Sequence, residues 1–289
     1  MLSKFLAMRG LIQKGSGGGG STPGGGEDVP DDGKTRLFIT LVEGRTSPMM
    51  GIGVSGTATV DWGDGTAPDV IVGSGGAKVQ WTPSHEYSKA GDYIICISAE
   101  GNEQVNAEDA RIFFLGRSTS ARGSYVLAHT ADADNRNDIY QDSINRICFG
   151  MATLKDYALM KCRNLKSVTM SDKTSFLGEA IFNGCFNLKF VMIPNGITTI
   201  KANTVGGCTA LTSIVVPSSV TTINAYAFGN CYSVRYYDFS NCTAVPALAN
   251  TSAFTGIPAD CEIRVPAALY DEWIAATNWA TYASQIVPV

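Results

Sequence analysis

Four cysteines recur at a constant interval in the second half of the chain. They are Cys162, Cys185, Cys208 and Cys231, and successive members of this set are 23 residues apart. An aliphatic residue follows each cysteine by three positions, and a short alternating apolar run follows that. A fixed period in this range is typical of a solenoid, in which each unit buries its apolar face only by stacking on its neighbours. The pattern therefore predicts a column of stacked coils, each coil being one repeat unit.

The unit over residues 211–231 carries the most regular pattern, and its apolar and small residues are Leu211, Ile214, Val216, Pro217, Val220, Ile223, Ala227, Phe228 and Cys231. This pattern resembles the BspA-type subclass of leucine-rich repeats, whose consensus runs roughly L-x-x-I-x-I-P-x-x-V-x-x-I-x-x-x-A-F-x-x-C. The resemblance covers about residues 140–255 and implies a solenoid over 138–255. The preceding unit has Thr204-Val205 where the family has Ala-Phe, which predicts a locally thinner core.

The regularly spaced cysteines are interpreted as reduced thiols. One cysteine per coil at a constant position predicts a column of small buried residues, a role that the thiol side chain fills well. Disulfides are the alternative, because the chain has eight cysteines, an even number. Zinc is disfavoured because no C-x-x-C pair is present and stacked coils do not give a tetrahedral site.

The repeat ends after Phe254, and residues 256–289 are predicted to form a small α/β cap. A strand is expected over Glu262–Val265, followed by a helix over Pro266–Ala276 that begins with proline. This stretch resembles the terminal cap of BspA-type repeat proteins from gut bacteria and their phages. Its aromatic residues are expected in the core rather than on a sugar-stacking surface: Trp273, Trp279 and Tyr282.

Residues 34–110 have the pattern of a small β-domain. Short β-branched and aromatic runs separated by Gly, Pro, Ser and Asp predict strands over 37–42, 56–61, 78–81 and 92–98. The turn Trp62-Gly63-Asp64-Gly65-Thr66 and the later segment from His85 through Tyr87 to Tyr93 resemble the PKD domain. The resemblance covers about residues 35–100 and implies an immunoglobulin-like β-sandwich that acts as a spacer or adhesion module. We expect a mainly β protein, a sandwich followed by the solenoid and its cap.

Three polar residues of this β-domain admit more than one role. Asp61 and Asp64 are interpreted as turn-stabilising residues. Calcium binding is the alternative, and it is disfavoured because Ca²⁺ takes six to eight oxygen ligands. His85 is interpreted as a structural histidine.

Residues 111–137 are expected to join the two domains, with strand-like runs at 111–116 and 125–128, and His129 has no catalytic partner nearby in the sequence.

The first 33 residues fall into two segments of different composition. Residues 1–14 are amphipathic and are interpreted as a docking peptide, with apolar residues at roughly helical spacing: Leu2, Phe5, Leu6, Met8, Leu11 and Ile12. Arg9 interrupts the apolar stretch that a secretory signal needs. Residues 15–33 are glycine-rich, and because glycine loses the most backbone entropy on ordering, they are expected to form a flexible linker.

Composition narrows the classes of function. The chain has 22 Lys and Arg against 26 Asp and Glu, a net charge of −4, which argues against nonspecific nucleic-acid binding. No run approaches the ~18 apolar residues of a membrane span. Only two histidines are present, and no set of nucleophile, base and orienting group can be assembled. We therefore expect no enzyme activity, cofactor or metal ion.

The resemblances imply a binding or display protein. The leading interpretation is a phage virion surface protein, such as a capsid decoration, head fibre or tail-associated adhesin. It would be docked to a capsid or tail protein by its N-terminus and would bind a host surface protein or glycan through its C-terminal domains. The alternatives are a bacterial cell-surface or secreted adhesin, and a purely structural decoration subunit. Neither nucleic-acid binding nor membrane insertion is expected, and a homo-oligomer is compatible with the sequence.

If the solenoid binds a partner, the outward positions of its strands are the candidate site. Strand alternation places one set of residues inward: Val168, Met170, Val191, Ile193, Ile214 and Val216. The candidate binding residues point the other way: Arg146, Phe190, Met192, Val215, Tyr236 and Asp238. An exposed apolar-aromatic patch of Phe190, Met192 and Tyr236 on adjacent coils is expected to mark a partner site. The alternative is that this face packs on another subunit or on the joining segment.

Overall fold

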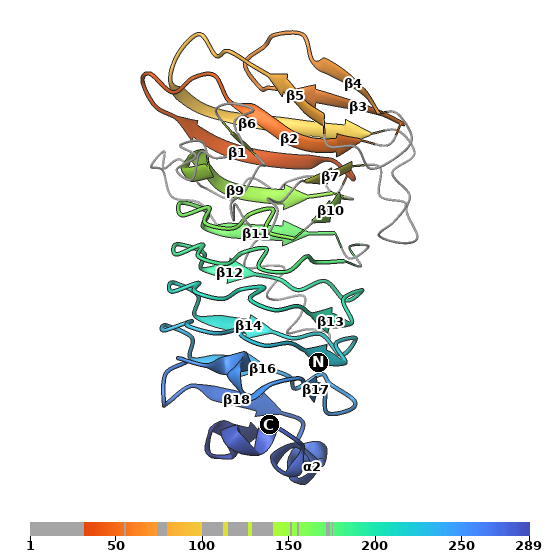
Figure 1. Ribbon diagram of the computed structural model, residues 1–289, viewed down its shortest axis with the longest axis vertical. Helices are drawn as coiled ribbons and strands as arrows, with labels where there is room; N and C mark the ends of the chain where they lie inside the picture. Colours follow the sequence, from red (N-terminus) through yellow and green to blue (C-terminus); the bar gives the residue numbers. More distant parts are fainter. Residues whose placement is uncertain are drawn as a thin grey trace, which may run out of the picture. The chain divides into compact units, whose positions relative to one another are not determined.

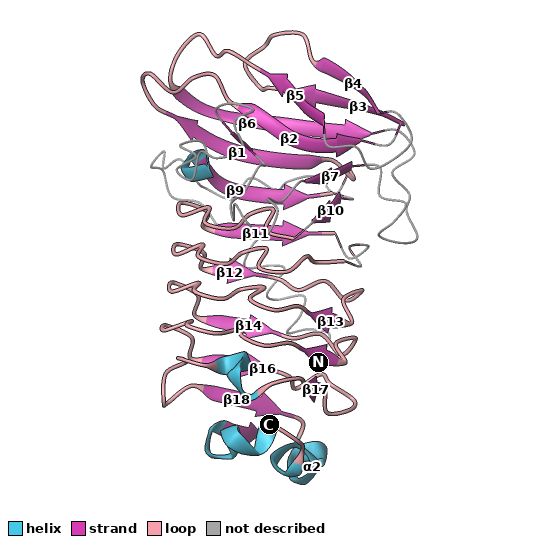
Figure 2. Ribbon diagram, viewed as in Figure 1, coloured by secondary structure: helices cyan, strands magenta, loops and turns pink. Residues whose placement is uncertain are grey.

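The computed structural model describes residues 32–54, 56–73, 80–99, 112–114, 127–128, 141–150, 152–154, 156–171, 174 and 176–289. The chain divides into two units, Met1–Asp32 and Gly33–Val289. The predicted docking peptide, most of the predicted linker, and most of the joining segment with His129 lie outside the described residues. The second unit is mainly β with a few short helices (Figures 1 and 2).

Two sheets form the N-terminal part of this unit. In the first, antiparallel neighbours follow the order β1 (Thr35–Leu41), β6 (Gly91–Ala99), β3 (Gly56–Asp61) and β4 (Asp69–Gly73). In the second, β2 (Met49–Val54) pairs with β5 (Gln80–Ser84), β7 (Ile112–Phe114) and β8 (Leu127–Ala128). Burial alternates along β1, as expected for a strand with one face on a core.

The two sheets continue into the first coil of the solenoid. Strand β9 (Ile144–Phe149) pairs antiparallel with β1, and β10 (Ala152–Leu154) pairs parallel with β7. Packing at this seam is close, since a Cβ on Gly150 would lie 2.1 Å from the carbonyl oxygen of Gly33. A solenoid needs its open ends covered. The strands of the N-terminal sheets therefore act as the cap on the first coil.

The coils stack through two lines of short parallel strands (Figure 1). One line follows β9 with β11 (Ser167–Met170), β12 (Phe190–Val191), β14 (Ser213–Val215), β16 (Tyr236–Asp238) and β18 (Glu262–Val265). The other line contains β13 (Thr199–Ile200), β15 (Thr222–Ile223) and β17 (Ala247–Leu248). In the central coils, strand partners are 23 residues apart, as in Ser167 with Phe190 and Ser213 with Tyr236.

The turns between strands repeat the same backbone geometry from coil to coil. Two positions per coil have positive φ, and each position recurs every 23 residues, the first at Tyr157, Ala180, Asn203 and Tyr226 and the second at Lys161, Gly184, Gly207 and Asn230. Only glycine, and to a lesser extent asparagine, adopts this conformation without strain. Backbone hydrogen bonds join successive turns, for example from the amide of Ala180 to the carbonyl of Ala202 at 2.9 Å.

The C-terminal cap closes the other end of the solenoid. Strand β18 lies where the sequence predicts it, but the predicted helix over 266–276 is shorter, because a 3₁₀ turn, η4 (Ala267–Leu269), precedes α2 (Tyr270–Ala275). The 3₁₀ helix η5 (Trp279–Gln285) and strand β19 (Ile286–Pro288) complete the cap. The predicted core role of the cap aromatics is confirmed by burial of Trp273, Trp279 and Tyr282.

The remaining short elements support the two ends of the solenoid, η2 (Gln141–Ser143) before the first coil and η3 (Thr251–Phe254) before the cap. Asn250 begins η3, where its side-chain oxygen accepts a hydrogen bond from the amide of Ser252, a typical N-cap arrangement. Phe254 is buried at the end of η3 and stacks on Phe228 with ring centroids 5.1 Å apart. This contact joins the last regular coil to the aromatic core of the cap.

Candidate functional site on the outer strand face

The first strand line presents alternate side chains to the inside and the outside of the solenoid. All six residues predicted to point inward are buried: Val168, Met170, Val191, Ile193, Ile214 and Val216. The six candidate binding residues do lie at the alternate positions, but Arg146, Phe190, Met192, Val215, Tyr236 and Asp238 are half-buried rather than exposed. Neighbouring parallel strands are about 4.8 Å apart, so each outward side chain is partly covered by those above and below.

The expected patch of Phe190, Met192 and Tyr236 on adjacent coils is not formed in that way. Phe190 pairs with Ser167 on one side, whereas Tyr236 pairs with Ser213 and Glu262. The coil carrying Ser213 therefore separates the two aromatic residues. Strand alternation and the period place each residue in the correct column. Phe190 and Tyr236 are 46 residues apart, which is two periods, so one coil lies between them.

Arg146 stands at the junction of the solenoid with strand β1. It pairs with Phe38 across the seam and with Ser167 along the strand line. Its guanidinium carbon lies 4.9 Å from the centroid of the Phe38 ring, a cation–π contact. Because one strand neighbour of Arg146 and its ring contact come from β1, this residue helps to hold the first coil against the N-terminal sheet.

A shallow hollow of about 610 Å³ lies at the C-terminal end of the strand face. Its lining includes Tyr232, Arg235, Tyr236, Asp260, Glu262 and Arg264. Tyr232 is 61% exposed. No sequence motif marks this hollow, although its residues lie just before and within the strands of the last two coils, where outward side chains were expected.

The polar groups of the hollow hold one another in place. The guanidinium of Arg264 lies over the Tyr236 ring, with its carbon 3.9 Å from the centroid, and its Nη2 lies 2.7 Å from Glu262 Oε2. The Arg264 Nε also donates a hydrogen bond to that oxygen at 2.7 Å. Two nitrogens of the guanidinium thus contact one carboxylate oxygen, a charge-assisted contact that restrains the direction of both side chains. Tyr236, Glu262 and Arg264 therefore hold one another in fixed positions along the wall of the hollow.

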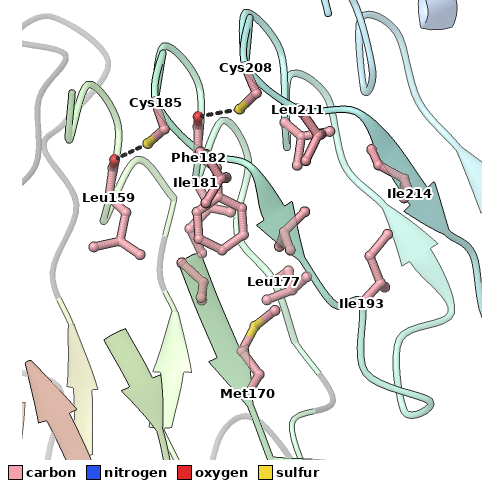
Figure 3. Packing of buried hydrophobic residues seen from close by; sticks show 14 of the residues in the cluster. Leu159, Met170, Leu177, Ile181, Phe182, Cys185, Ile193, Cys208, Leu211 and Ile214 are labelled. Carbon is pink, nitrogen blue, oxygen red and sulfur yellow. Dashed lines mark hydrogen bonds between the residues drawn. The ribbon is translucent and has the colours of Figure 1, made fainter. Parts of the chain in front are cut away.

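The regularly spaced cysteines lie inside the solenoid and not on this face. Figure 3 shows Cys185 and Cys208 directed at carbonyls of the preceding coil, with Sγ to oxygen distances of 3.2 Å to Leu159 and 3.2 Å to Phe182. All eight cysteines are thiols, as predicted. Burial raises the pKa of Cys185 and Cys208 well above the usual range, and that of Cys231 to about 11. Such thiols are poor nucleophiles, since the thiolate is the reactive form.

The second polar cluster is the turn after β3. Trp62 is buried, stacks on His85 with ring centroids 4.9 Å apart, and accepts a hydrogen bond on its carbonyl from the Tyr87 hydroxyl at 2.9 Å. Tyr87 also packs against the Tyr93 ring at 4.2 Å. The residues that carry the PKD resemblance therefore meet in one aromatic cluster.

Both aspartates of this turn accept hydrogen bonds from the turn itself. Asp61 accepts from the amide of Gly63 at 2.9 Å, and Asp64 accepts from the amide and hydroxyl of Thr66 at 3.1 and 2.7 Å. The other Asp64 oxygen lies 2.8 Å from His85 Nε2. The Thr66 hydroxyl, followed by His85, lowers the pKa of Asp64 to about 2. The structural interpretation of these residues fits this geometry.

Two further statements hold for the part of the chain that the structure describes. No group of three or more His, Cys, Asp or Glu side chains there is arranged to hold a metal ion. Within the same residues, none of the helices has the length and apolar character needed to cross a membrane.

Comparison with known proteins identifies the repeats. Residues 140–257 match the family of BspA type leucine rich repeat regions in six copies, so this part of the chain consists of BspA-type leucine-rich repeats. Among solved structures, the chain is similar to a leucine rich cell surface protein from Faecalibacterium prausnitzii A2-165, with 25% identity and a TM-score of 0.39. The similarity covers 52% of this chain and 36% of that protein. No curated protein matches the chain.

Proposed function

We propose that this protein is a non-enzymatic binding protein of the adhesin type, acting at the bacterial cell surface or after secretion. The observation that carries the proposal is the run of BspA-type repeats over residues 140–257, a type named for a bacterial surface protein. Stacked coils present a continuous, regularly spaced strand face that suits contact with an extended partner. The contact surface in this proposal is the outer strand face and the hollow at its end.

The N-terminal sheets have the role of a spacer in this proposal. The aromatic cluster of Trp62, His85, Tyr87 and Tyr93 supports assignment of this region to a PKD-like, immunoglobulin-like sandwich. The pairing of β1 with β9 supports a spacer that also stiffens the first coil of the solenoid. A rigid scaffold of this kind holds a binding face at low entropic cost.

The non-enzymatic part of the proposal rests on how the reactive groups are used. The cysteines of the column are buried with raised pKa values, and Asp64 and His85 are engaged with each other. A catalytic nucleophile needs an accessible position beside a base that activates it. Of the two arginines that line the hollow, Arg264 is likewise engaged with Glu262 and Tyr236.

A second candidate is the virion surface protein suggested by the N-terminal sequence. An amphipathic peptide at 1–14 followed by a glycine-rich segment at 15–33 favours a docked and tethered display protein. Fractionation separates the candidates. Detection in the cell envelope or the medium supports the adhesin, whereas enrichment in purified phage particles supports the virion protein. Detection in the cytoplasm alone contradicts both.

The experiment for the contact surface uses the full chain on an array of glycans and extracellular-matrix proteins. The double variant Phe190→Ser with Tyr236→Ser is compared with Tyr226→Ser, which removes a tyrosine that is 46% exposed in a turn away from the strand face. Loss of array binding in the double variant alone supports the proposal. Equal binding by both variants, with circular dichroism unchanged, or absence of binding to any array surface and to bacterial cells, refutes it.

A further inference from the structure

Basic side chains gather on one edge of the solenoid, although the protein as a whole is acidic. The net charge of the chain is −4, yet residues 157–201 contain six Lys and Arg against two Asp and Glu. Four of these basic side chains lie exposed where a turn leads into a strand, and we call them the basic edge: Lys161, Arg163, Lys166 and Lys189. Within the described residues, no ion pair involves these four side chains, whereas Lys201 and Arg264 contact Asp156 and Glu262.

Backbone hydrogen bonds show that the basic edge is built on two neighbouring coils. The amide of Lys189 donates to the carbonyl of Lys166 at 2.9 Å, and the side-chain nitrogen of Asn187 donates to the carbonyl of Arg163 at 2.9 Å. Coils joined in this way are about 4.8 Å apart. The four charges therefore belong to one compact surface rather than to separate parts of the molecule.

An exposed aromatic ring lies among these charges. Phe186 is 46% exposed and lies three residues before Lys189 in the same coil. A Cβ on the neighbouring Gly184 would lie 3.9 Å from Phe186 Cζ and 3.4 Å from Lys161 Cγ, so ring and lysine stem border the same spot. The ring therefore offers a flat apolar contact beside the charges of the basic edge.

The same columns continue toward the hollow. Tyr232 stands 46 residues after Phe186, two repeats along the column, and Arg235 stands 46 residues after Lys189. Both are exposed, and both line the hollow. The coil between the basic edge and the hollow carries Thr209 and Thr212 at these two positions, so the two are separate groups on the same columns.

The positive charge of the basic edge is confined to two coils. Before them, Asp142 Oδ1 accepts a hydrogen bond from the amide of Arg163 at 3.2 Å, which places a carboxylate beside the first coil. After them, the equivalent positions on the next coil are the neutral Thr209 and Thr212. A polyanion that ran past the first coil would meet like charge, and on the coil after the second it would meet no cation in these columns. The basic edge is therefore matched to a short anionic ligand.

We infer that the basic edge, together with Phe186, binds a negatively charged oligosaccharide. Lysine and arginine would contact its sulfate or carboxylate groups, and the flat CH face of a sugar ring would pack on the Phe186 ring. Double-stranded nucleic acid is disfavoured, because its charges are dense and continuous and its binding is built on many phosphate contacts. The inference rests on the proposed function and specifies the chemistry of the partner.

The test measures binding of the full chain to a heparin octasaccharide at low salt. The double variant Lys166→Glu with Lys189→Glu is compared with Arg45→Glu with Lys89→Glu, which makes the same change of charge at exposed positions of the N-terminal sheets. Reversal of two surface charges near the ligand is expected to weaken binding about tenfold, and the control variant less than about twofold. Phe186→Ser tests the ring contact and is expected to weaken binding with unchanged salt dependence.

Three results would overturn the inference: no heparin binding by the wild-type chain, equal weakening by the control variant, or tighter binding of a single-stranded DNA of similar charge. Binding to bacterial cells or to the array is measured in parallel. If the wild-type chain and the Lys166→Glu with Lys189→Glu variant bind these surfaces equally well, the oligosaccharide inference fails while the proposed function stands. Absence of binding by the wild-type chain to every one of these surfaces contradicts the proposed function itself.

Discussion

Replacement of Cys208 by alanine tests whether the cysteine column stabilises the solenoid by packing. Cys208 is fully buried, and its thiol donates to the Phe182 carbonyl of the preceding coil at 3.2 Å. That carbonyl also accepts the amide of Cys185 at 3.1 Å, so it keeps a partner when the sulfur is removed. The expected cost is thus the loss of one buried heavy atom and the small cavity that it leaves.

Removal of one buried methylene-sized group costs about 0.8 kcal/mol, and the residual cavity brings the total to about 1–2 kcal/mol. For a chain of this size, the melting temperature should fall by roughly 2–4 °C for each kcal/mol. Urea unfolding followed by circular dichroism measures the free energy directly. Ser233→Ala, at an exposed position of the next coil, should change it by less than about 0.5 kcal/mol.

Thiol labelling gives the same experiment a second readout. Because burial raises the pKa of Cys208, its reaction with a disulfide reagent should be slow in the native state and should speed up only as the protein unfolds. A cysteine introduced by Ser233→Cys should react at once and calibrates the rate. Wild-type stability in Cys208→Ala, or labelling of native Cys208 as fast as that of the introduced cysteine, would refute the packing account.

Three further predictions concern the N-terminal turn and the C-terminal cap. Gly63→Ala should lower the free energy of unfolding by several kcal/mol, because φ is +77° and the added Cβ would lie 2.4 Å from the Ile94 carbonyl oxygen. Gly65→Ala, at φ +86° with open space around the added Cβ, should lower it by only about 1–2 kcal/mol, as measured by urea unfolding. The stability that Asp64 contributes is fully present above its ordinary pKa of 3.8 and is lost as pH falls toward about 2, so Asp64→Asn should flatten the pH dependence of unfolding over that window. Trp279→Ala should cost about 3–5 kcal/mol by calorimetry, because the buried ring packs on three other aromatic side chains and its Nε1 donates to the Pro246 carbonyl.

The repeat region could be predicted closely because its period fixes which residues share a column. Strand alternation placed Val168 and Ile214 inside, and the consensus placed Phe228 and Cys231 there, and all four are buried. Strand β18 was also predicted within its observed bounds. These features depend on local pattern, and a solenoid repeats the same local pattern in every coil.

The N-terminal strands were harder to predict where glycine weakens the pattern. Strand β2 reads MMGIGV and β4 ends in glycine, so neither shows the β-branched alternation that marks a strand. The predicted strand at 92–98 is confirmed within Gly91–Ala99, and that at 37–42 starts two residues earlier, at Thr35. The neighbours supplied by tertiary pairing decide these boundaries.

The parts of the candidate site that depend on long-range contacts could not be read from the sequence. Pairing of β1 with β9 joins residues more than a hundred positions apart, and no local pattern encodes it. The hollow depends on Arg264 lying over Tyr236, a choice of side-chain direction that periodicity does not determine. The column in which each of these residues lies was predictable, whereas the side chains that it contacts were not.

The central structural claim is that the N-terminal sheets cap the solenoid, so that residues 33–289 form one cooperative unit. Differential scanning calorimetry of the wild-type chain and of Leu37→Ala tests it most directly, because Leu37 is buried on β1 opposite Ile147 of β9. The account predicts a single transition, with calorimetric and van't Hoff enthalpies equal, that moves as a whole to lower temperature in the variant. Two separate transitions, with only one of them shifted by Leu37→Ala, would contradict it.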